Sequence, residues 1–275
     1  MAFMEITGNP LTDITEPIAE LQSSFDTTYV FQLGPWGISQ YTFWMFISIA
    51  FLLVVVLLGS RKVTLVPKNK FGSMVEYGYD AVRRNMGEGA VGHGYEKHLP
   101  FLATLFLFIL FSNVIGLIPS FKTCTGTLGC TWALSAISFI YFNFYGIKAK
   151  GGWGYIKSIA PAGLPAPMVP IIWFFEFISL VIRLLTLAVR LYGNMFAGHM
   201  VLGIFAILCQ CFILNAASAL SAGIIGSGIG FGAVSIVWFA FLIAMYVLEC
   251  LVAFLQAYVF TVLSAVYIGL AQGEH

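Results

Sequence analysis

Two long apolar tracts constrain the fold of this chain more than any other feature of its sequence. They cover residues 169–213 and roughly 231–270, and each is much longer than the about 20 residues that one perpendicular bilayer crossing requires. We therefore expect both helices to tilt, bend or extend beyond the bilayer. The composition agrees, because 60% of the residues are hydrophobic and only 9% are charged, against about 25% charged residues in soluble domains. A water-soluble enzyme is thereby excluded.

The sequence predicts an all-α polytopic membrane protein with about five transmembrane helices. Spans are expected at about residues 41–59, 99–118, 132–147, 169–213 and 231–270, in one membrane domain over residues 41–275. Residues 1–40 form an acidic segment without Lys or Arg, and this segment lacks the basic start and short apolar stretch of a signal peptide. Five glycines between Gly223 and Gly232 form a helix-breaking cluster. The last two spans should therefore form a tilted antiparallel hairpin.

The distribution of basic residues predicts the orientation in the membrane. Lys122 stands alone on one side, whereas ten basic residues fall in two loops on the other: Arg61, Lys62, Lys68, Lys70, Arg83, Arg84, Lys97, Lys148, Lys150 and Lys157. By the positive-inside rule both basic loops are cytoplasmic. The N-terminus is then outside and the C-terminus is in the cytoplasm. A formal net charge of +1 gives no indication of a nucleic-acid partner.

An interfacial amphipathic helix is expected at about residues 73–86, between the first two spans. Ser73 and Glu76 have the spacing of a capping box. Charged residues share one face of this helix and apolar residues another: Glu76, Asp80, Arg83 and Arg84 against Val75, Tyr79 and Val82. Two interpretations are open, a helix lying on lipid headgroups and a docking surface for another subunit.

Cysteine positions indicate one candidate disulfide and no metal site. Cys124 and Cys130 both lie in the short loop 119–131, which is predicted to be outside, where a disulfide is chemically permitted. The other three cysteines lie in apolar tracts, where they act as small hydrophobes. No group of cysteines and histidines has metal-ligand spacing. We expect neither a metal nor a cofactor.

A polar stripe runs along the first long tract. Glu176, Arg183 and Arg190 are spaced seven residues apart, which places them on nearly one face of a helix. Thr186 and Asn194 flank Arg190 at four-residue spacing. An arginine at membrane depth costs from about 2.5 to about 17 kcal/mol, so it marks a functional site by default. The alternative is a ladder of buried ion pairs that holds helices together, although Arg190 has no acidic residue three or four positions away.

The predicted hairpin pairs polar residues of the two long tracts. In an antiparallel hairpin, the numbers of facing residues add to a nearly constant value. Arg190 with Gln256 gives 446 and His199 with Glu249 gives 448, and half of each falls at the edge of the glycine cluster. We therefore expect Gln256 at the depth of Arg190, and Glu249 at the depth of His199.

His199 lies nine residues from Arg190, which is 180° around a helix, so the two basic groups point to opposite sides. Histidine and glutamate both titrate near neutral pH when their surroundings perturb them. The pair His199 and Glu249 is therefore a candidate for a proton access path. A hydrogen-bonded core histidine is the alternative interpretation of His199.

Two stretches carry a family resemblance. Residues 188–199, AVRLYGNMFAGH, resemble the signature of the a subunit of bacterial-like rotary F-type (FoF1) ATP synthases, and residues 248–260, LECLVAFLQAYVF, resemble its last helix. Weaker agreement extends through Val66-Pro67, Glu76, Asn113 and Pro119. The resemblance covers nearly all of the chain past residue 60.

The resemblance implies roles for individual residues. The family's arginine corresponds to Arg190, its polar companion to Asn194 and the glutamine that faces the arginine to Gln256. The acid/histidine pair corresponds to His199 and Glu249, an order that is reversed in some relatives. Asn113 and the stripe residues Glu176, Arg183 and Thr186 are expected to support the proton-translocation residues. Where some relatives carry an aspartate three residues after the asparagine, this chain departs from the pattern with Gly116.

The implied function is that of the proton-channel stator subunit in a bacterial plasma membrane. The implied partners are an oligomeric ring of c subunits, the peripheral-stalk b subunits, the rest of the FoF1 ATP synthase and membrane lipid. ATP chemistry would belong to other subunits, because this chain lacks a Gly-rich phosphate-binding motif ending in Lys-Ser/Thr. The alternative functions are a secondary transporter with an intramembrane Arg/His/Glu substrate site and a purely structural scaffold. The sequence has no matching halves of the kind that transporters show.

Overall fold

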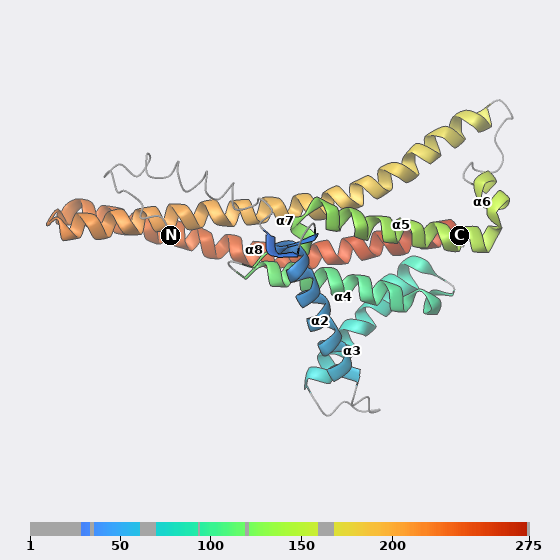
Figure 1. Ribbon diagram of the computed structural model, residues 1–275, viewed down its shortest axis with the longest axis horizontal. Helices are drawn as coiled ribbons and strands as arrows, with labels where there is room; N and C mark the ends of the chain where they lie inside the picture. The colour runs from blue at the N-terminus through green and yellow to red at the C-terminus, as the bar shows by residue number, and fades with distance from the viewer. Residues whose placement is uncertain are drawn as a thin grey trace. The chain divides into compact units, whose positions relative to one another are not determined.

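The computed structural model describes residues 29–33, 36–60, 70–92, 94–118, 121–158 and 168–273. Five helices in these ranges are long and apolar enough to cross a membrane. They are α2 (Gln40–Ser60), α4 (Leu99–Gly116), α5 (Leu128–Lys150), α7 (Val169–Ser221) and α8 (Ile225–Gln272) (Figure 1). The predicted all-α polytopic fold, with two very long final helices, is confirmed. The acidic residues of the N-terminal segment all lie outside the described residues.

Shorter elements connect the long helices. An antiparallel hairpin of β1 (Tyr29–Leu33) and β2 (Trp36–Ser39) directly precedes α2, and the sequence patterns did not predict it. The predicted amphipathic helix is present as α3 (Lys70–Val82), which continues as a π-helical segment, η1 (Arg83–Val91). Because α3 begins at Lys70, Ser73 lies inside it, and the predicted capping box at Ser73 is wrong. The remaining short helices are η2 (Tyr95–Lys97), η3 (Cys124–Gly126) and α6 (Gly152–Ser158).

The chain folds into two compact units, and both long helices contribute to each of them. Unit 1 comprises Met1–Gln40 and Met195–Val252, and unit 2 comprises Tyr41–Asn194 and Ala253–His275.

Unit 1 contains the tip of the helical hairpin. Its turn is shorter than the glycine cluster predicted, because α7 continues to Ser221 and α8 begins at Ile225. Only Gly223 in the turn has a positive φ, at 79°. The later glycines lie inside α8, since a helix in lipid keeps its backbone hydrogen bonds rather than leaving polar groups unpaired. Gly228 also makes room for a neighbour, because a Cβ there would lie 2.7 Å from Leu220 Cγ.

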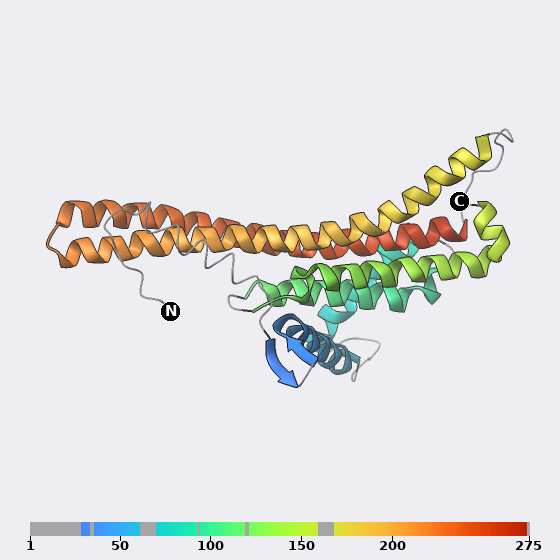
Figure 2. The same ribbon diagram turned by 45° about the horizontal axis from the view of Figure 1, so that its top comes forward.

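The register of the hairpin in unit 1 follows from its ring and polar contacts. The ring centroids of Phe205 and Trp238 are 5.8 Å apart, and Cys209 Sγ donates to the carbonyl oxygen of Ser235 at 3.9 Å. The two helical segments lie side by side in both views (Figures 1 and 2). The numbers of these facing residues add to 443 and 444, close to the values that the sequence predicts.

Unit 2 contains the apolar core of the described residues. Helices α4 and α5 pack with the C-terminal part of α8 and with the part of α7 before Met195, and the fully buried side chains include Leu102, Ile109, Leu191, Phe260 and Ile268. Side-chain hydroxyls tie these helices together across the core. Ser138 donates to Ser264 Oγ at 2.8 Å, and Ser135 donates to the Leu184 carbonyl oxygen at 2.6 Å.

Candidate functional site

The carboxyl group of Glu249 lies against the backbone of α7 at Gly198, within unit 1. A Cβ at residue 198 would overlap the carboxyl carbon and both carboxyl oxygens of Glu249. Glu249 is buried, with 4% of its surface exposed. Glycine at 198 is therefore what allows an acidic side chain to lie in this place between the two helices.

His199 follows Gly198 on α7 and is partly buried. Its Nε2 atom and the Oε1 atom of Glu249 are both buried, and neither has a hydrogen-bond partner in the part of the chain that the structure describes. The structure thus brings Glu249 to the turn of α7 that carries His199, but no hydrogen bond joins the two side chains. A proton or a small polar molecule placed here would find one basic and one acidic group without competing partners.

The two arginines of the polar stripe, both in unit 2, differ in their surroundings. The guanidinium carbon of Arg183 lies 5.1 Å from the ring centroid of Tyr267, a cation–π contact. Arg190 is exposed and has no ion pair, hydrogen bond or ring contact within the described part of the chain. No other group among the described residues therefore neutralises the charge of the Arg190 guanidinium.

Unit 2 holds two further unpartnered polar groups. The Nδ2 atom of Asn194, one turn after Arg190, and the Nε2 atom of Gln256 are buried, and no described residue forms a hydrogen bond with either atom. Gln256 is 5% exposed. Across the described residues, four buried side-chain atoms lack a partner, and all four belong to residues that the sequence singled out: Asn194, His199, Glu249 and Gln256. Buried polar groups in native proteins nearly always have partners, so the pair in unit 1 and the pair in unit 2 are each exceptions to that rule.

Asn113, in contrast, is fully buried, and both ends of its side-chain amide form hydrogen bonds. Its Nδ2 atom donates to the carbonyl oxygen of Ala253 on α8 at 3.2 Å. Its Oδ1 atom accepts from the hydroxyl of Thr125 at 2.8 Å. The Thr125 and Thr123 hydroxyl oxygens are 2.7 Å apart, and Thr123 contacts the hydroxyl of Ser112 at 3.2 Å. We call the four residues Ser112, Thr123, Thr125 and Asn113 the hydroxyl ladder.

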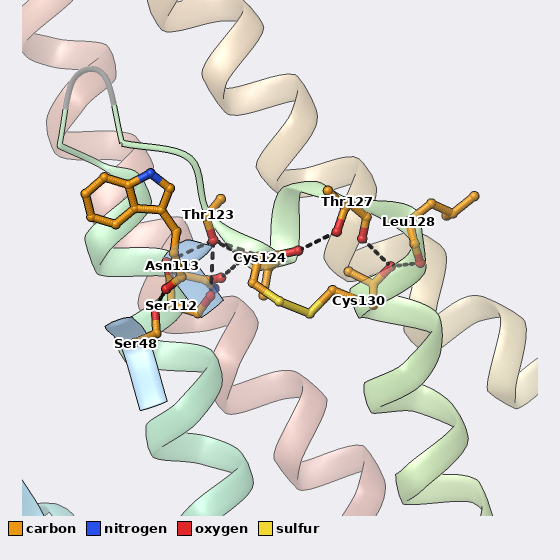
Figure 3. The surroundings of a disulfide bond; sticks show 11 residues. Ser48, Ser112, Asn113, Thr123, Cys124, Thr127, Leu128 and Cys130 are labelled. Atoms are coloured by element: carbon orange, nitrogen blue, oxygen red, sulfur yellow. Dashed lines mark hydrogen bonds between the residues drawn. A yellow bond between two sulfur atoms is a disulfide. The ribbon is translucent and has the colours of Figure 1, made fainter. Parts of the chain in front are cut away.

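A disulfide between Cys124 and Cys130 borders the hydroxyl ladder. Figure 3 shows Ser112, Asn113 and Thr123 together on one side of it, with Thr127 and Leu128 on the other. The hydroxyl of Thr127 donates to the Cys124 carbonyl oxygen at 2.9 Å. The sequence permitted this bond, and the structure contains it.

The other stripe residues take part in local packing. Thr186 Oγ1 donates to the carbonyl oxygen of Arg183 at 3.1 Å. Near Arg183, the phenol of Tyr155 on α6 donates to Asn143 Oδ1 at 2.8 Å. Burial raises the pKa of the Tyr155 phenol above its ordinary value, and the positive charge of Arg183 opposes that rise. Glu176 is partly buried.

The sequence patterns did not predict the roles of Gly198 and of two threonines. Gly198 lies within the motif at residues 188–199, and its place beside His199 and opposite Glu249 in the predicted hairpin could have indicated its packing role. The threonines at 123 and 125 gave no signal, because their partners are brought together only by the fold. Among the described residues no group of three or more histidine, cysteine or acidic side chains could hold a metal ion.

Comparison with known proteins gives consistent matches. The family model described as "ATP synthase A chain" matches residues 42–269. The "ATP synthase subunit a" of Chlorobium phaeobacteroides is 37% identical over 239 residues, which cover 85% of this chain and 64% of that protein. The "ATP synthase subunit a 2" of Prosthecochloris aestuarii is 36% identical over 86% of this chain and 68% of its own length. The "ATP synthase subunit a" of Brucella ovis is 38% identical over 74% of this chain and 76% of its own length.

Proposed function

This chain belongs to the ATP synthase A chain family, and on that premise we propose that it is the proton-channel stator subunit of a rotary ATP synthase. In this role it provides two offset half-channels, one from each side of the membrane, to a carboxyl group on a neighbouring rotor ring. The observation that supports this role best is the set of buried polar atoms that have no hydrogen-bond partner in the described residues, at His199 and Glu249 in unit 1 and at Asn194 and Gln256 in unit 2. Proton transfer to a moving partner requires groups that are not already bonded within the chain.

Arg190 acts on the rotor carboxyl group. Its permanent charge favours the deprotonated carboxylate as that group passes, because an opposite charge nearby stabilises the charged form of an acid. The same charge repels protons, so it prevents a direct leak between the two half-channels. This role needs a guanidinium that no other group of the subunit engages. Among the described residues Arg190 has no partner, whereas Arg183 lies over the ring of Tyr267.

Glu249 and His199 belong to the half-channel through which protons arrive from outside. The carboxyl group over Gly198 and the imidazole one residue further on form two steps of a relay. Asn194 and Gln256 offer amide groups to the rotor carboxyl or to ordered water near Arg190. Each proton that moves through 100 mV releases about 2.3 kcal/mol, so several protons must be combined for each ATP.

The proposed partners are an oligomeric ring of c subunits, peripheral-stalk b subunits and the other parts of an FoF1 ATP synthase. The orientation with the N-terminus outside and the C-terminus in the cytoplasm of a bacterial plasma membrane also stays a prediction. It rests on the alternation of basic loops.

Replacement of Arg190 and Arg183 in the assembled complex tests this function. We expect Arg190→Ala to abolish ATP synthesis driven by a proton gradient in sealed vesicles, while the complex still copurifies with its rotor ring. Arg183→Ala is the matched control on the same helix face, and it should retain synthesis. Normal synthesis in the Arg190 variant contradicts the proposal. If the wild-type protein instead purifies without other subunits and binds a small solute, a secondary transporter is favoured.

A further inference from the structure

The position of the Gln256 amide group depends on its backbone. Its Nε2 atom has no hydrogen-bond partner in the described residues, so no side-chain bond holds it in place. One turn earlier on α8, the carbonyl oxygen of Ala253 accepts a hydrogen bond from Asn113 Nδ2 on α4 at 3.2 Å. Ala253 and Ala257 have no exposed surface. This bond therefore fixes the rotation and depth of α8 near Gln256.

Asn113 can hold Ala253 only if its amide group keeps one orientation. A carbonyl oxygen accepts and cannot donate, so the NH₂ end must face Ala253 and the Oδ1 atom must face Thr125. The one hydroxyl proton of Thr125 is then committed to Asn113 Oδ1. The Thr123 hydroxyl oxygen lies 2.7 Å from that of Thr125, and it donates to the carbonyl oxygen of Ser112 at 2.9 Å.

Ser112 on α4 holds Thr123 in turn. Because the Thr123 proton goes to the Ser112 carbonyl oxygen, the 3.2 Å contact between the Ser112 and Thr123 hydroxyls takes its proton from Ser112. The backbone N–H of Thr125 also donates to Thr123 Oγ1, at 3.2 Å. Thr123 thus ties the loop that carries Thr125 to α4 beside Asn113, and Thr125 and Asn113 carry the bonds on to Ala253.

The disulfide sets the place of Thr125. Cys124 and Cys130 close a short loop that contains Thr125 and joins directly to the start of α5 at Leu128. Cross-linking limits the conformations that this loop can adopt. Reduction would release this constraint on the one residue whose hydroxyl fixes the Asn113 amide.

From this sequence of bonds we infer that Thr125, held by the Cys124–Cys130 loop, is a positioning residue for Gln256 and acts through Asn113. The inference rests on the proposed function, because Gln256 matters only if its amide meets the rotor site. It also gives a role to the loop after Gly116, the position at which this chain lacks the aspartate of some relatives.

The test compares Thr125→Val with Thr125→Ser in the whole reconstituted complex. Valine keeps the shape of threonine but cannot donate to Asn113, whereas serine can. We expect Thr125→Val to lower proton-driven ATP synthesis several-fold and to speed backbone hydrogen exchange in residues 253–260. Exchange in residues 138–146 of α5 should be unchanged. Thr125→Ser should leave both ATP synthesis and the exchange of residues 253–260 near their wild-type values.

Reduction of the native complex provides an independent perturbation. Dithiothreitol added to assembled wild-type complex should speed exchange in residues 253–260 and lower synthesis, whereas a Cys124→Ser/Cys130→Ser variant should not respond to the reductant. If Thr125→Val does not assemble, this measurement decides alone, and unchanged exchange in reduced wild-type complex overturns the inference.

The remaining outcomes separate the inference from the proposed function. Lower synthesis in Thr125→Val without faster exchange means that the hydroxyl acts by another route, and the inference that Thr125 positions Gln256 is then wrong. Normal synthesis in Thr125→Val together with an inactive Arg190→Ala overturns this inference alone. Normal synthesis in Arg190→Ala overturns the proposed function itself.

Discussion

The hydroxyl ladder and the four unpartnered groups are both buried and polar, but only the ladder is complete in itself. Each ladder residue has at least one hydrogen bond from side chain to side chain or to backbone. Asn194, His199, Glu249 and Gln256 each have a buried atom without a hydrogen-bond partner in the described part of the chain. The comparison separates polar groups whose bonds hold helices together from polar groups that, under the proposed function, bind another molecule. The two arginines of α7 differ in the same way, because Arg183 contacts the ring of Tyr267 whereas Arg190 has no partner among the described residues.

Replacement of Glu249 should give the largest effect among the unpartnered groups. Glu249→Gln keeps volume and hydrogen-bonding capacity but removes the titratable group, so we expect proton-driven synthesis to fall roughly a hundredfold, as for loss of a general acid or base. Assembly should change much less. The measurement is ATP synthesis in sealed vesicles as a function of pH.

The exchanged pair sharpens this prediction. A double variant with His199→Glu and Glu249→His should recover part of the activity lost in either single variant, since the same two groups are present in the opposite order. A double variant that is no better than the worse single would show that the two residues do not work as a pair.

Gly198→Ala tests the place of Glu249 without changing any titratable group. The new Cβ would overlap the carboxyl group, and forcing extra atoms into a packed site typically costs about 1–3 kcal/mol. We expect synthesis to fall about tenfold, which corresponds to about 1.4 kcal/mol. Gly193→Ala is the matched control, because a Cβ there meets nothing within 4 Å. Equal activity in both variants would break the link between Gly198 and Glu249.

Leucine replacements compare a satisfied amide with an unsatisfied one. Asn113→Leu removes the acceptor of the Thr125 hydroxyl and the side-chain donor to the Ala253 carbonyl oxygen, so it should destabilise the complex by about 1–3 kcal/mol. Gln256→Leu removes an amide that has no partner for Nε2, so stability should change little while synthesis falls several-fold. Thermal unfolding of the detergent-solubilised complex measures the first effect. The comparison fails if Gln256→Leu is the more destabilising of the two.

Much of this arrangement could be predicted from the sequence because helix geometry relates residue number to depth. The hairpin register required only the positions of Arg190, His199, Glu249 and Gln256, and the observed pairing of Phe205 with Trp238 agrees with it. The limits of the turn could not be predicted from glycine content. Glycine destabilises a helix in water. In lipid, however, leaving backbone N–H and C=O groups unpaired costs more free energy than keeping the glycines in the helix.

The hydroxyl ladder could not be predicted for a different reason. Asn113 and Ala253 are separated by 140 positions, and no periodicity connects them. The ladder depends on tertiary contacts between α4, the loop after it and α8. The short β1–β2 hairpin was missed although the dipeptide Gly34-Pro35 between its two strands is a turn signal.

Tyr155→Phe should have the smallest effect, since Tyr155 belongs with the structural groups. Loss of its hydrogen bond to Asn143 should cost about 1 kcal/mol of stability, with near-normal synthesis. Because burial raises the pKa of Tyr155 in the folded protein, the contribution of the phenol is complete below its ordinary pKa of about 10. It is lost as the pH rises through the higher folded value. Unfolding curves of both proteins at neutral and alkaline pH check this, and a Phe variant with the same alkaline loss as wild type would contradict it.

The proton leak of vesicles that carry Arg190→Ala tests the central claim most directly. The claim is that an unpartnered Arg190 separates the two half-channels, whereas Arg183, which lies over Tyr267, only packs helices. A pH gradient imposed across vesicles with the assembled Arg190→Ala complex should decay faster than in wild-type or Arg183→Ala vesicles, and it should drive no ATP synthesis. An unchanged rate of decay together with normal synthesis in Arg190→Ala would contradict the claim.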